Sequence, residues 1–436
     1  MTHETAEDAA AEASQPGVPP NAARAWAVTT FDAFRFPVYR VVWLGSILSF
    51  LAFNMSWTAQ SVVAYDLTGS NSAVGSVMFG QGLAMLVLNP FGGAIADRFA
   101  KRTLILIGQS VIGGVMLTIA ILLAVDKISI LVLAIGAFTV GSMFSFLGPT
   151  RTALLGEIVS GERIGNAMAL LQVGGNFTRI SGPFVAGLLL AWPLIGATGT
   201  YFFIAAMFIL VLATLNRIPV SPPTASRETS VLEDVRVGFR YVLGNQRLLH
   251  AVVSFHLVTM IGLSYFVLVP GFVKDVLGAG TAGIGLILGA AAAGGLIASL
   301  MVASLADSSR GPLVLRVSGV SAGVALIFTG LAPSFAIAIV TMIFVAGGIA
   351  AFQTLNNVTA LRLTAPEFYG RVIALIFIAW GLISLVSLPV GLLADRFSER
   401  VVLSGSGGVL ILAMLFLALW EMRLGAEPAE PDVAGG

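Results

Sequence analysis

The chain has 436 residues, of which 57% are hydrophobic and 10% are charged. Because so few polar side chains cannot cover a water-soluble globule of this size, the composition excludes an ordinary soluble protein and indicates a membrane protein. A net charge of +1 gives no reason to expect a nucleic-acid partner. The absence of cysteine excludes disulfides and thiolate metal sites, and the three histidines lack metal-ligand spacing, so we expect neither a metal nor a cofactor.

The chain begins with residues 1–38, which contain acidic residues among alanines and prolines and no signal-peptide pattern, so we expect a disordered cytoplasmic tail. Twelve apolar runs follow, each close to the length of about 20 residues that a helix needs to cross a bilayer. They span approximately residues 41–65, 72–95, 103–125, 129–149, 164–191, 198–217, 248–273, 281–304, 313–331, 334–359, 370–393 and 401–422.

The distribution of basic residues predicts the orientation of these spans. An even number of spans puts both termini on one side, and with that side cytoplasmic, 18 of the 23 Lys and Arg fall inside. Four fall outside, namely Lys127, Lys274, Arg396 and Arg400, and Arg179 lies within a span. Since cytoplasmic loops carry an excess of Lys and Arg, both termini are expected in the cytoplasm.

Between spans 2 and 3 lies a charged turn, GGAIADRFAKRT, at residues 92–103. Its pattern G-x-x-A-D-R-x-x-K-R resembles the signature loop of the major facilitator superfamily. Ala100 stands where that pattern usually has glycine, so we expect this turn to avoid a left-handed conformation. The resemblance implies an all-α membrane protein of twelve helices in two pseudo-symmetric six-helix bundles, working by alternating access.

A polar stretch divides the chain into these two halves. We predict bundles at 39–218 and 248–424, a cytoplasmic linker at 219–247 and a cytoplasmic tail at 425–436. In the linker, Ser230 and Glu233 form a capping-box pattern before an amphipathic helix with Phe239, Val242 and Leu243 on its apolar face. That helix either lies on the inner membrane surface or packs on the protein.

Two internal matches indicate that the halves are related. A shift of 210 residues brings Gly75, Ala96 and Asp97 onto Gly285, Ala306 and Asp307. A shift of 205 residues brings the pattern E-x-x-G-x-x-x-A-L at residues 162–170 onto residues 367–375. In such parallel repeats the substrate site lies between the halves, near the middle of the bilayer.

Four stretches, 65–70, 149–153, 166–170 and 176–183, resemble the exporters that include macrolide efflux pumps and enterobactin exporters. This resemblance implies a monomeric, proton-coupled exporter of an amphipathic small molecule such as a drug, macrolide or siderophore, in a bacterial cytoplasmic membrane. Gly182, Pro183 and Gly187 resemble the helix 5 packing motif of drug:proton antiporters. Helix 4, predicted from Ser129 to Pro149, lacks the arginine that many such antiporters carry, which leaves proton coupling open.

We expect gating at the inner surface, where Asp97 would face the helix start at Gly370 and Arg371, and Asp307 the helix start at residues 165–166. Alternatively, these are only topological charges. The candidate gating residues are Gly93, Asp97, Arg98, Lys101, Arg102, Asp307, Gly370 and Arg371. A similar charged turn at residues 391–400 is assigned no gating role, because it falls on the outer side and its charges cancel.

Arg179 is the one charge well inside a span. It either lines a cavity or bonds structurally, with Asn54, Asn176, backbone carbonyls or an anionic substrate as its partner. The candidate cavity residues are Asn54, Trp57, Thr58, Gln81, Gln172, Asn176, Arg179, Gln353, Asn356, Asn357 and Trp380. Membrane aromatics and amides also serve simply in packing.

Proton coupling requires a titratable group, and the candidates are Asp66 at the outer end of span 1, His256 in span 7 and Asp97 itself, with Asp66 placed first. The rival functions are an uptake symporter or facilitator of the same fold and a non-transporting sensor. No spacing of His, Ser and carboxylate supports an enzyme.

Overall fold

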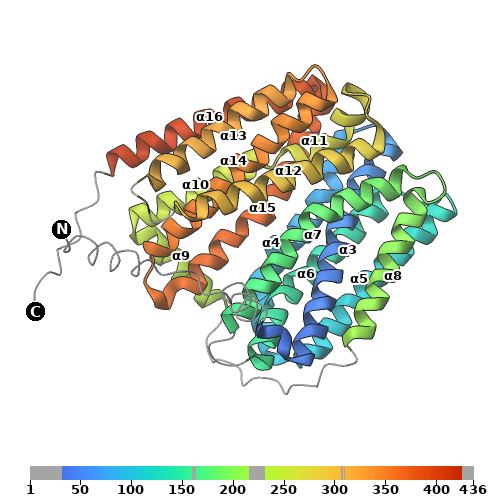
Figure 1. Ribbon diagram of the computed structural model, residues 1–436, viewed down its shortest axis with the longest axis horizontal. Coiled ribbons are helices and arrows are strands. Elements are labelled where there is room, and N and C mark those ends of the chain that lie inside the picture. Colours follow the sequence, from blue (N-terminus) through green and yellow to red (C-terminus); the bar gives the residue numbers. More distant parts are fainter. Residues whose placement is uncertain (1–31, 160–163, 216–230, 306–307, 309, 425–436) are drawn as a thin grey trace, which may run out of the picture.

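The computed structural model describes residues 32–159, 164–215, 231–305, 308 and 310–424, and all regular structure within these ranges is helical. Two groups of long helices lie side by side (Figure 1). The first group contains η1 (Asp32–Arg35), α3 (Pro37–Thr68), α4 (Asn71–Arg98), α5 (Lys101–Ala124), α6 (Ile130–Ile158), α7 (Ile164–Ala191) and α8 (Gly196–Leu215).

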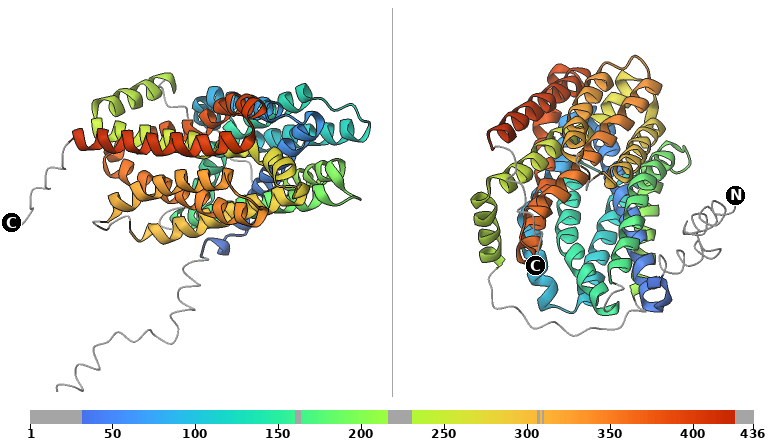
Figure 2. Two further views of the ribbon diagram at one scale, coloured as in Figure 1. Left: turned by 90° about the horizontal axis from the view of Figure 1, so that it is seen from above. Right: turned by 60° about the vertical axis from the view of Figure 1, so that its left-hand side comes forward.

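The second group contains α10 (Gln246–Gly262), α11 (Tyr265–Gly271), η3 (Phe272–Val276), α12 (Gly280–Ala303), α13 (Gly311–Gly330), α14 (Phe335–Arg362), η4 (Pro366–Phe368), α15 (Tyr369–Phe397) and α16 (Glu399–Arg423). The short helix α9 (Val231–Gly244) lies at one end of this group (Figures 1 and 2). We call this end of the molecule the α9 side.

Eleven of the described helical stretches are long and apolar enough to cross a membrane, with α10, α11 and η3 counted as one. The twelfth long helix is α7, which has 28 residues but carries Gln172, Asn176 and Arg179. These polar residues lower its hydropathy, although its length suffices for a span. The all-α membrane fold expected from the sequence is therefore confirmed.

The seventh membrane span, made of α10, α11 and η3, differs from the single span expected at residues 248–273. It is interrupted after Gly262, resumes as α11 at Tyr265, and continues as the π-helix η3 up to Val276. Pro270 lies inside α11, where its missing N–H removes one helical hydrogen bond. The chain therefore carries Lys274 and Asp275 on a short segment of its own, separated from the rest of the helix.

The two halves meet along two helix pairs, α4 with α15 and α7 with α12. At the second crossing, a Cβ added to Gly187 would lie 2.5 Å from the Cα of Gly285. No side chain fits at that distance, so glycine at this crossing lets the two backbones touch. In the other part of the helix 5 motif, Gly182 packs against Asn54 of α3, within its own half.

The linker helix α9 packs on the protein along one of its sides. Its Tyr241 stacks on Phe368 with ring centroids 4.0 Å apart, and its Val242 is buried. Phe239 and Leu243 of the same helix are half exposed. One side of α9 therefore packs on the protein and another presents apolar side chains outward, while Ser230 of the predicted capping box lies outside the described residues.

Candidate functional site

Polar bonds join the two halves at the end opposite the α9 side. In the last turn of α3, the Tyr65 hydroxyl donates a hydrogen bond to the Asp275 carboxylate, and Asp66 forms an ion pair with Lys274. Helix α3 ends here because Gly69 adopts a left-handed conformation, with φ of 65°. The end of α3 is thereby attached to η3 of the other half.

A second set of bonds attaches the start of α4 to the turn between α15 and α16. The Asp395 carboxylate accepts hydrogen bonds from the Ser70 hydroxyl at 2.6 Å, the Asn71 N–H at 2.7 Å and the Ser72 N–H at 3.0 Å. The Asn71 side chain donates to Glu399 at 2.8 Å. A carboxylate at a helix N-terminus satisfies exposed N–H groups and interacts favourably with the helix dipole.

We refer to these bonds together as the seal, and to this end of the molecule as the seal side. Its residues are Tyr65, Asp66, Ser70, Asn71 and Ser72 in the first half and Lys274, Asp275, Asp395 and Glu399 in the second. The sequence suggests no gating role for the turn at residues 391–400, because its charges cancel. In the structure, however, this turn contacts the opposite half, since Asp395 and Glu399 both bond to residues at the start of α4.

Gly271 occupies the centre of the seal. A Cβ added there would lie 2.5 Å from Glu399 Oε1, and 2.9 Å from both Asn71 Oδ1 and a ring carbon of Tyr65. Three seal residues therefore converge on a position that only glycine can fill without displacing them.

Halfway along the helices, Arg179 of α7 reaches across to the second half. Its guanidinium carbon lies 5.2 Å from the centroid of the Trp380 ring on α15, and the Arg179 side chain is nevertheless exposed. Among the described residues it has no ion pair. Its neighbour is thus an aromatic ring, in place of the amides considered from the sequence, and its exposed donors remain available to an incoming group.

The remaining cavity candidates divide according to burial. Gln172 is exposed, and Asn54, Trp57, Asn176, Gln353, Asn357 and Trp380 are half-buried. Thr58, Gln81 and Asn356 are buried, so the structure removes them from the accessible surface. Two of these three have backbone partners: Thr58 donates to the Asn54 carbonyl at 3.3 Å, and Asn356 donates to the Ala251 carbonyl at 2.9 Å.

The half-buried candidates also have partners, either within their own halves or across the seam, by which we mean the interface between the two halves. Asn54 donates to the Phe50 carbonyl at 2.8 Å, and Gln353 donates to Thr259 at 2.9 Å. Trp57 stacks on Phe266 of the second half, with centroids 5.5 Å apart. The structure therefore contains two separate contacts of this kind between the halves, Arg179 with Trp380 and Trp57 with Phe266.

Arg151 is a buried cation that the sequence prediction misses. Helix α6 continues through Pro149 to Ile158, so helix 4 does contain an arginine, and the expectation that it has none is wrong. Arg151 is 4% exposed, donates to the Ser49 hydroxyl at 2.6 Å and lies 4.9 Å from the Phe50 ring centroid. Gln109 donates to the same Ser49 at 3.0 Å, which completes a buried polar group inside the first half.

Two of the coupling candidates, Asp66 and His256, occupy different surroundings. Asp66 bonds to Lys274 across the seal, whereas the half-buried His256 donates from Nδ1 to the Val252 carbonyl at 2.7 Å, within its own helix. Only Asp66 therefore connects the halves.

On the α9 side, the expected gating residues are described only in part. Lys101 is 2% exposed and lies 2.5 Å from Glu157, within the first half. Arg371 lies over the Phe368 ring, and no described atom lies within 4 Å of a Cβ added to Gly370. Ala100 has a φ of −58°, so the turn avoids the left-handed conformation as expected.

Three of the other gating candidates on this side lie near the end of α4, and one lies at the start of α5. Arg102 starts α5 beside Lys101. Gly93, Asp97 and Arg98 belong to α4, but their surroundings, like Asp307 itself, lie outside the described residues.

Comparisons with known proteins agree with this architecture. The family model for transmembrane secretion effectors matches residues 28–432. The enterobactin exporters EntS of Shigella dysenteriae serotype 1 and of Escherichia coli O1:K1 are each 26% identical to the chain over 396 residues, covering 89% of this chain and 93% of the relative.

Solved structures show the same fold. A bacterial homologue of the human lysosomal transporter Spinster, in an inward-facing and unoccupied conformation, aligns with a TM-score of 0.74 at 14% identity, covering 90% of this chain and 99% of that one. The nucleoside transporter NupG aligns with a TM-score of 0.73 at 14% identity, covering 88% and 99%.

Proposed function

Because the chain belongs to the transmembrane secretion effector family, and is therefore a multi-pass membrane transporter, we propose that it exports an amphipathic small molecule by alternating access. The observation that carries this proposal is the seal. It closes one end of the seam between the halves, while the exposed Arg179 lies farther along the same seam. A substrate bound beside Arg179 would enter from the α9 side and leave when the seal opens.

The direction of transport depends on which side faces the cytoplasm. The excess of Lys and Arg supports a cytoplasmic α9 side, with both termini in the cytoplasm of a bacterial cell. The seal then faces outward, and the state with a closed seal is the one that loads substrate from inside. On the α9 side, Asp97 and its neighbours would form the complementary gate, which closes when the seal opens.

The chemistry beside Arg179 favours a substrate with a negative or hydrogen-bond-accepting group and a flat apolar surface. Arg179 offers donors, and the neighbouring Trp380 offers an aromatic ring. A siderophore satisfies this description, and the named function of the EntS relatives supports that substrate class.

We propose protons as the coupling ion and Asp66 as the coupling residue. A proton on the Asp66 carboxylate removes its attraction to Lys274 and so weakens a bond between the halves. His256 bonds to the backbone of Val252 and of Leu375, both in the second half, so its titration would not change a contact of the seal. In proteoliposomes, Asp66→Asn should abolish substrate-induced proton release while substrate binding survives, and His256→Gln should leave release intact. Loss of release in His256→Gln alone would transfer the role to α10.

The function is tested by expressing the protein in cells challenged with a panel of siderophores and drugs. Export lowers the cellular content of the substrate relative to cells expressing Arg179→Gln, whereas an uptake symporter or facilitator raises it. Equal contents for every compound would indicate a non-transporting sensor and refute the proposal.

A further inference from the structure

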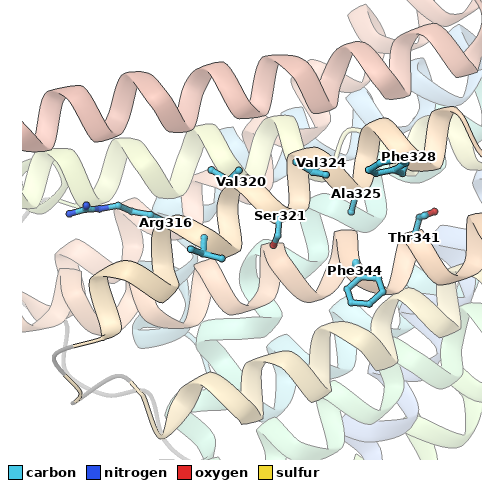
Figure 3. Close-up of a pocket in the computed structure, with 9 residues that line it drawn as sticks. Arg316, Val320, Ser321, Val324, Ala325, Phe328, Thr341 and Phe344 are labelled. Atoms are coloured by element: carbon cyan, nitrogen blue, oxygen red, sulfur yellow. The ribbon is translucent and has the colours of Figure 1, made fainter.

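A large surface groove lies between α13 and α14, away from the seam. Its volume is about 590 Å³, and its walls are formed mainly by Val320, Val324 and Phe328 of α13 and Phe344 of α14 (Figure 3). The main packing partners of α13 are α14 and α16, and those of α14 are α12 and α13, all in the second half. The groove therefore opens toward the lipid and is not a part of the substrate route.

The two hydroxyl groups that line the groove already have hydrogen-bond partners in the protein. The Ser321 hydroxyl donates to the Ser318 carbonyl at 2.9 Å, and the Thr341 hydroxyl lies 3.0 Å from the Ala338 carbonyl. With both hydroxyls already hydrogen-bonded, the exposed surface of the groove is hydrocarbon in character, which favours an acyl chain.

The length of the groove matches one leaflet of a bilayer. Arg316 lies at one end, and Phe328 and Thr341 lie at the other (Figure 3). The twelve-residue separation between Arg316 and Phe328 corresponds to about 18 Å along a helix. One leaflet contributes about 15 Å, half of the hydrocarbon thickness of a bilayer. An acyl chain reaching from the membrane surface toward the midplane would fill this distance.

The end of the groove on the α9 side carries both signs of charge. Arg316 pairs with Glu421 of α16 through Nε–Oε2 at 3.1 Å and Nη2–Oε1 at 3.0 Å, and the two side chains are 45% and 38% exposed. The bonds at Arg316 use only Nε and Nη2, so the Nη1 donors bond to no acceptor among the described residues. A guanidinium can donate to phosphate, and a carboxylate has further lone pairs for an ammonium group.

We propose that this groove is a binding site for a phospholipid with an ethanolamine headgroup, from the leaflet on the α9 side. Its phosphate accepts hydrogen bonds from Arg316, its primary ammonium donates to Glu421, and one acyl chain lies along Val320, Val324 and Phe344. A choline headgroup has no N–H to donate to Glu421, and a glycerol headgroup has no cation, so both bind more weakly.

The proposal is tested with the full chain in nanodiscs that contain equal amounts of ethanolamine, choline and glycerol phospholipids with identical acyl chains. After extraction into mild detergent, mass spectrometry counts the lipids that each protein retains. We expect the wild type to retain the ethanolamine lipid about fivefold over the others, a ratio corresponding to about 1 kcal/mol, as for one exposed ion pair.

Matched variants separate the headgroup from the chain. Arg316→Gln should lower total retention about fivefold, whereas Arg423→Gln, at the end of α16 on the same side, should behave as the wild type. Glu421→Gln should abolish only the preference for ethanolamine. Ser321→Phe should block the groove with the charge pair intact, and Leu412→Phe on the exposed face of α16 is its control. Retention of the three lipids as supplied, or equal retention by Arg316→Gln and Arg423→Gln, would overturn the proposal.

Discussion

Replacing Asp395 by asparagine removes the charge of the seal while keeping the size of the side chain. In the structure the carboxylate accepts three hydrogen bonds from the start of α4, at 2.6, 2.7 and 3.0 Å. An asparagine oxygen can retain only part of this set, and its amide N–H₂ group cannot accept from the helix N–H groups. The variant should therefore weaken the seal without disturbing the packing around it.

The expected magnitude follows from the exposure of the site. A charge at a helix N-terminus contributes about 0.3–1 kcal/mol at an exposed position and up to about 2 kcal/mol in a partly buried one. The Asp395 side chain is exposed, but it holds three bonds, so we take about 1 kcal/mol for its loss. That value lowers the ratio of sealed to open molecules about fivefold.

Spin labels can measure this ratio because the chain contains no cysteine. Val125→Cys at the end of α5 and Leu331→Cys after α13 place two labels on the seal side, one in each half, at exposed positions outside the seal. The distribution of label distances then reports the fraction of open molecules, and Asp395→Asn should increase the population at long distances.

Arg396→Gln is the matched control, since it changes the neighbouring charge. Arg396 is exposed and lies over the ring of Phe397 on its own helix. If Asp395→Asn and Arg396→Gln give the same distance distribution as the unmodified protein, the seal does not stabilise the closed state and the reasoning is refuted.

Four further predictions concern topology, gating, the buried cation and the centre of the seal. Ser398→Cys should be labelled by a membrane-impermeant thiol reagent added outside intact cells, and labelling only from the inner side would contradict the proposed orientation. Asp97→Asn should reduce transport at normal expression, measured as substrate efflux per inserted protein, and undiminished efflux would remove Asp97 from the gate. Arg151→Met should leave the thermal unfolding midpoint in detergent unchanged or raised while transport falls, because a buried cation without a carboxylate partner is expensive to keep; a lower midpoint with normal transport would indicate a structural role. Gly271→Ala should shift the spin-label distances toward the open state, since the added carbon would lie 2.5 Å from Glu399, and an unchanged distribution would show that this contact can relax.

Hydropathy predicts the spans of this chain well, but the end of α6 shows where it fails. A proline and an arginine after a long apolar run suggest that the helix stops at Pro149, yet α6 continues to Ile158. Prolines are tolerated inside membrane helices, and the Arg151 charge is accommodated by Ser49 and the Phe50 ring, which are about 100 residues away in sequence. No local pattern contains that information.

The bonds of the seal cannot be predicted from the sequence for a similar reason. Asp395 acts on the first turn of α4, more than 300 residues earlier, so its partner depends on how the two halves dock. The polar face of helix 1 illustrates the same limit, because Asn54 and Thr58 share that face but only Thr58 is buried. Helical spacing indicates which residues point in one direction, whereas packing decides whether that direction leads to a cavity or to another helix.

The interruption of the span formed by α10, α11 and η3 has a consequence for how fast the seal can break. Residues 265–276 follow the break after Gly262, contain Pro270 and continue as the π-helix that carries Lys274 and Asp275. Most of its side chains are buried, but its helical hydrogen bonds are interrupted at the break and at Pro270, so the segment can open locally apart from the rest of the bundle. Its amide hydrogens should therefore exchange with deuterium sooner than those of the uninterrupted helix α13. Two of the six bonds of the seal, those from Tyr65 and Asp66, would then be released by local fraying, before either six-helix bundle rotates as a rigid body.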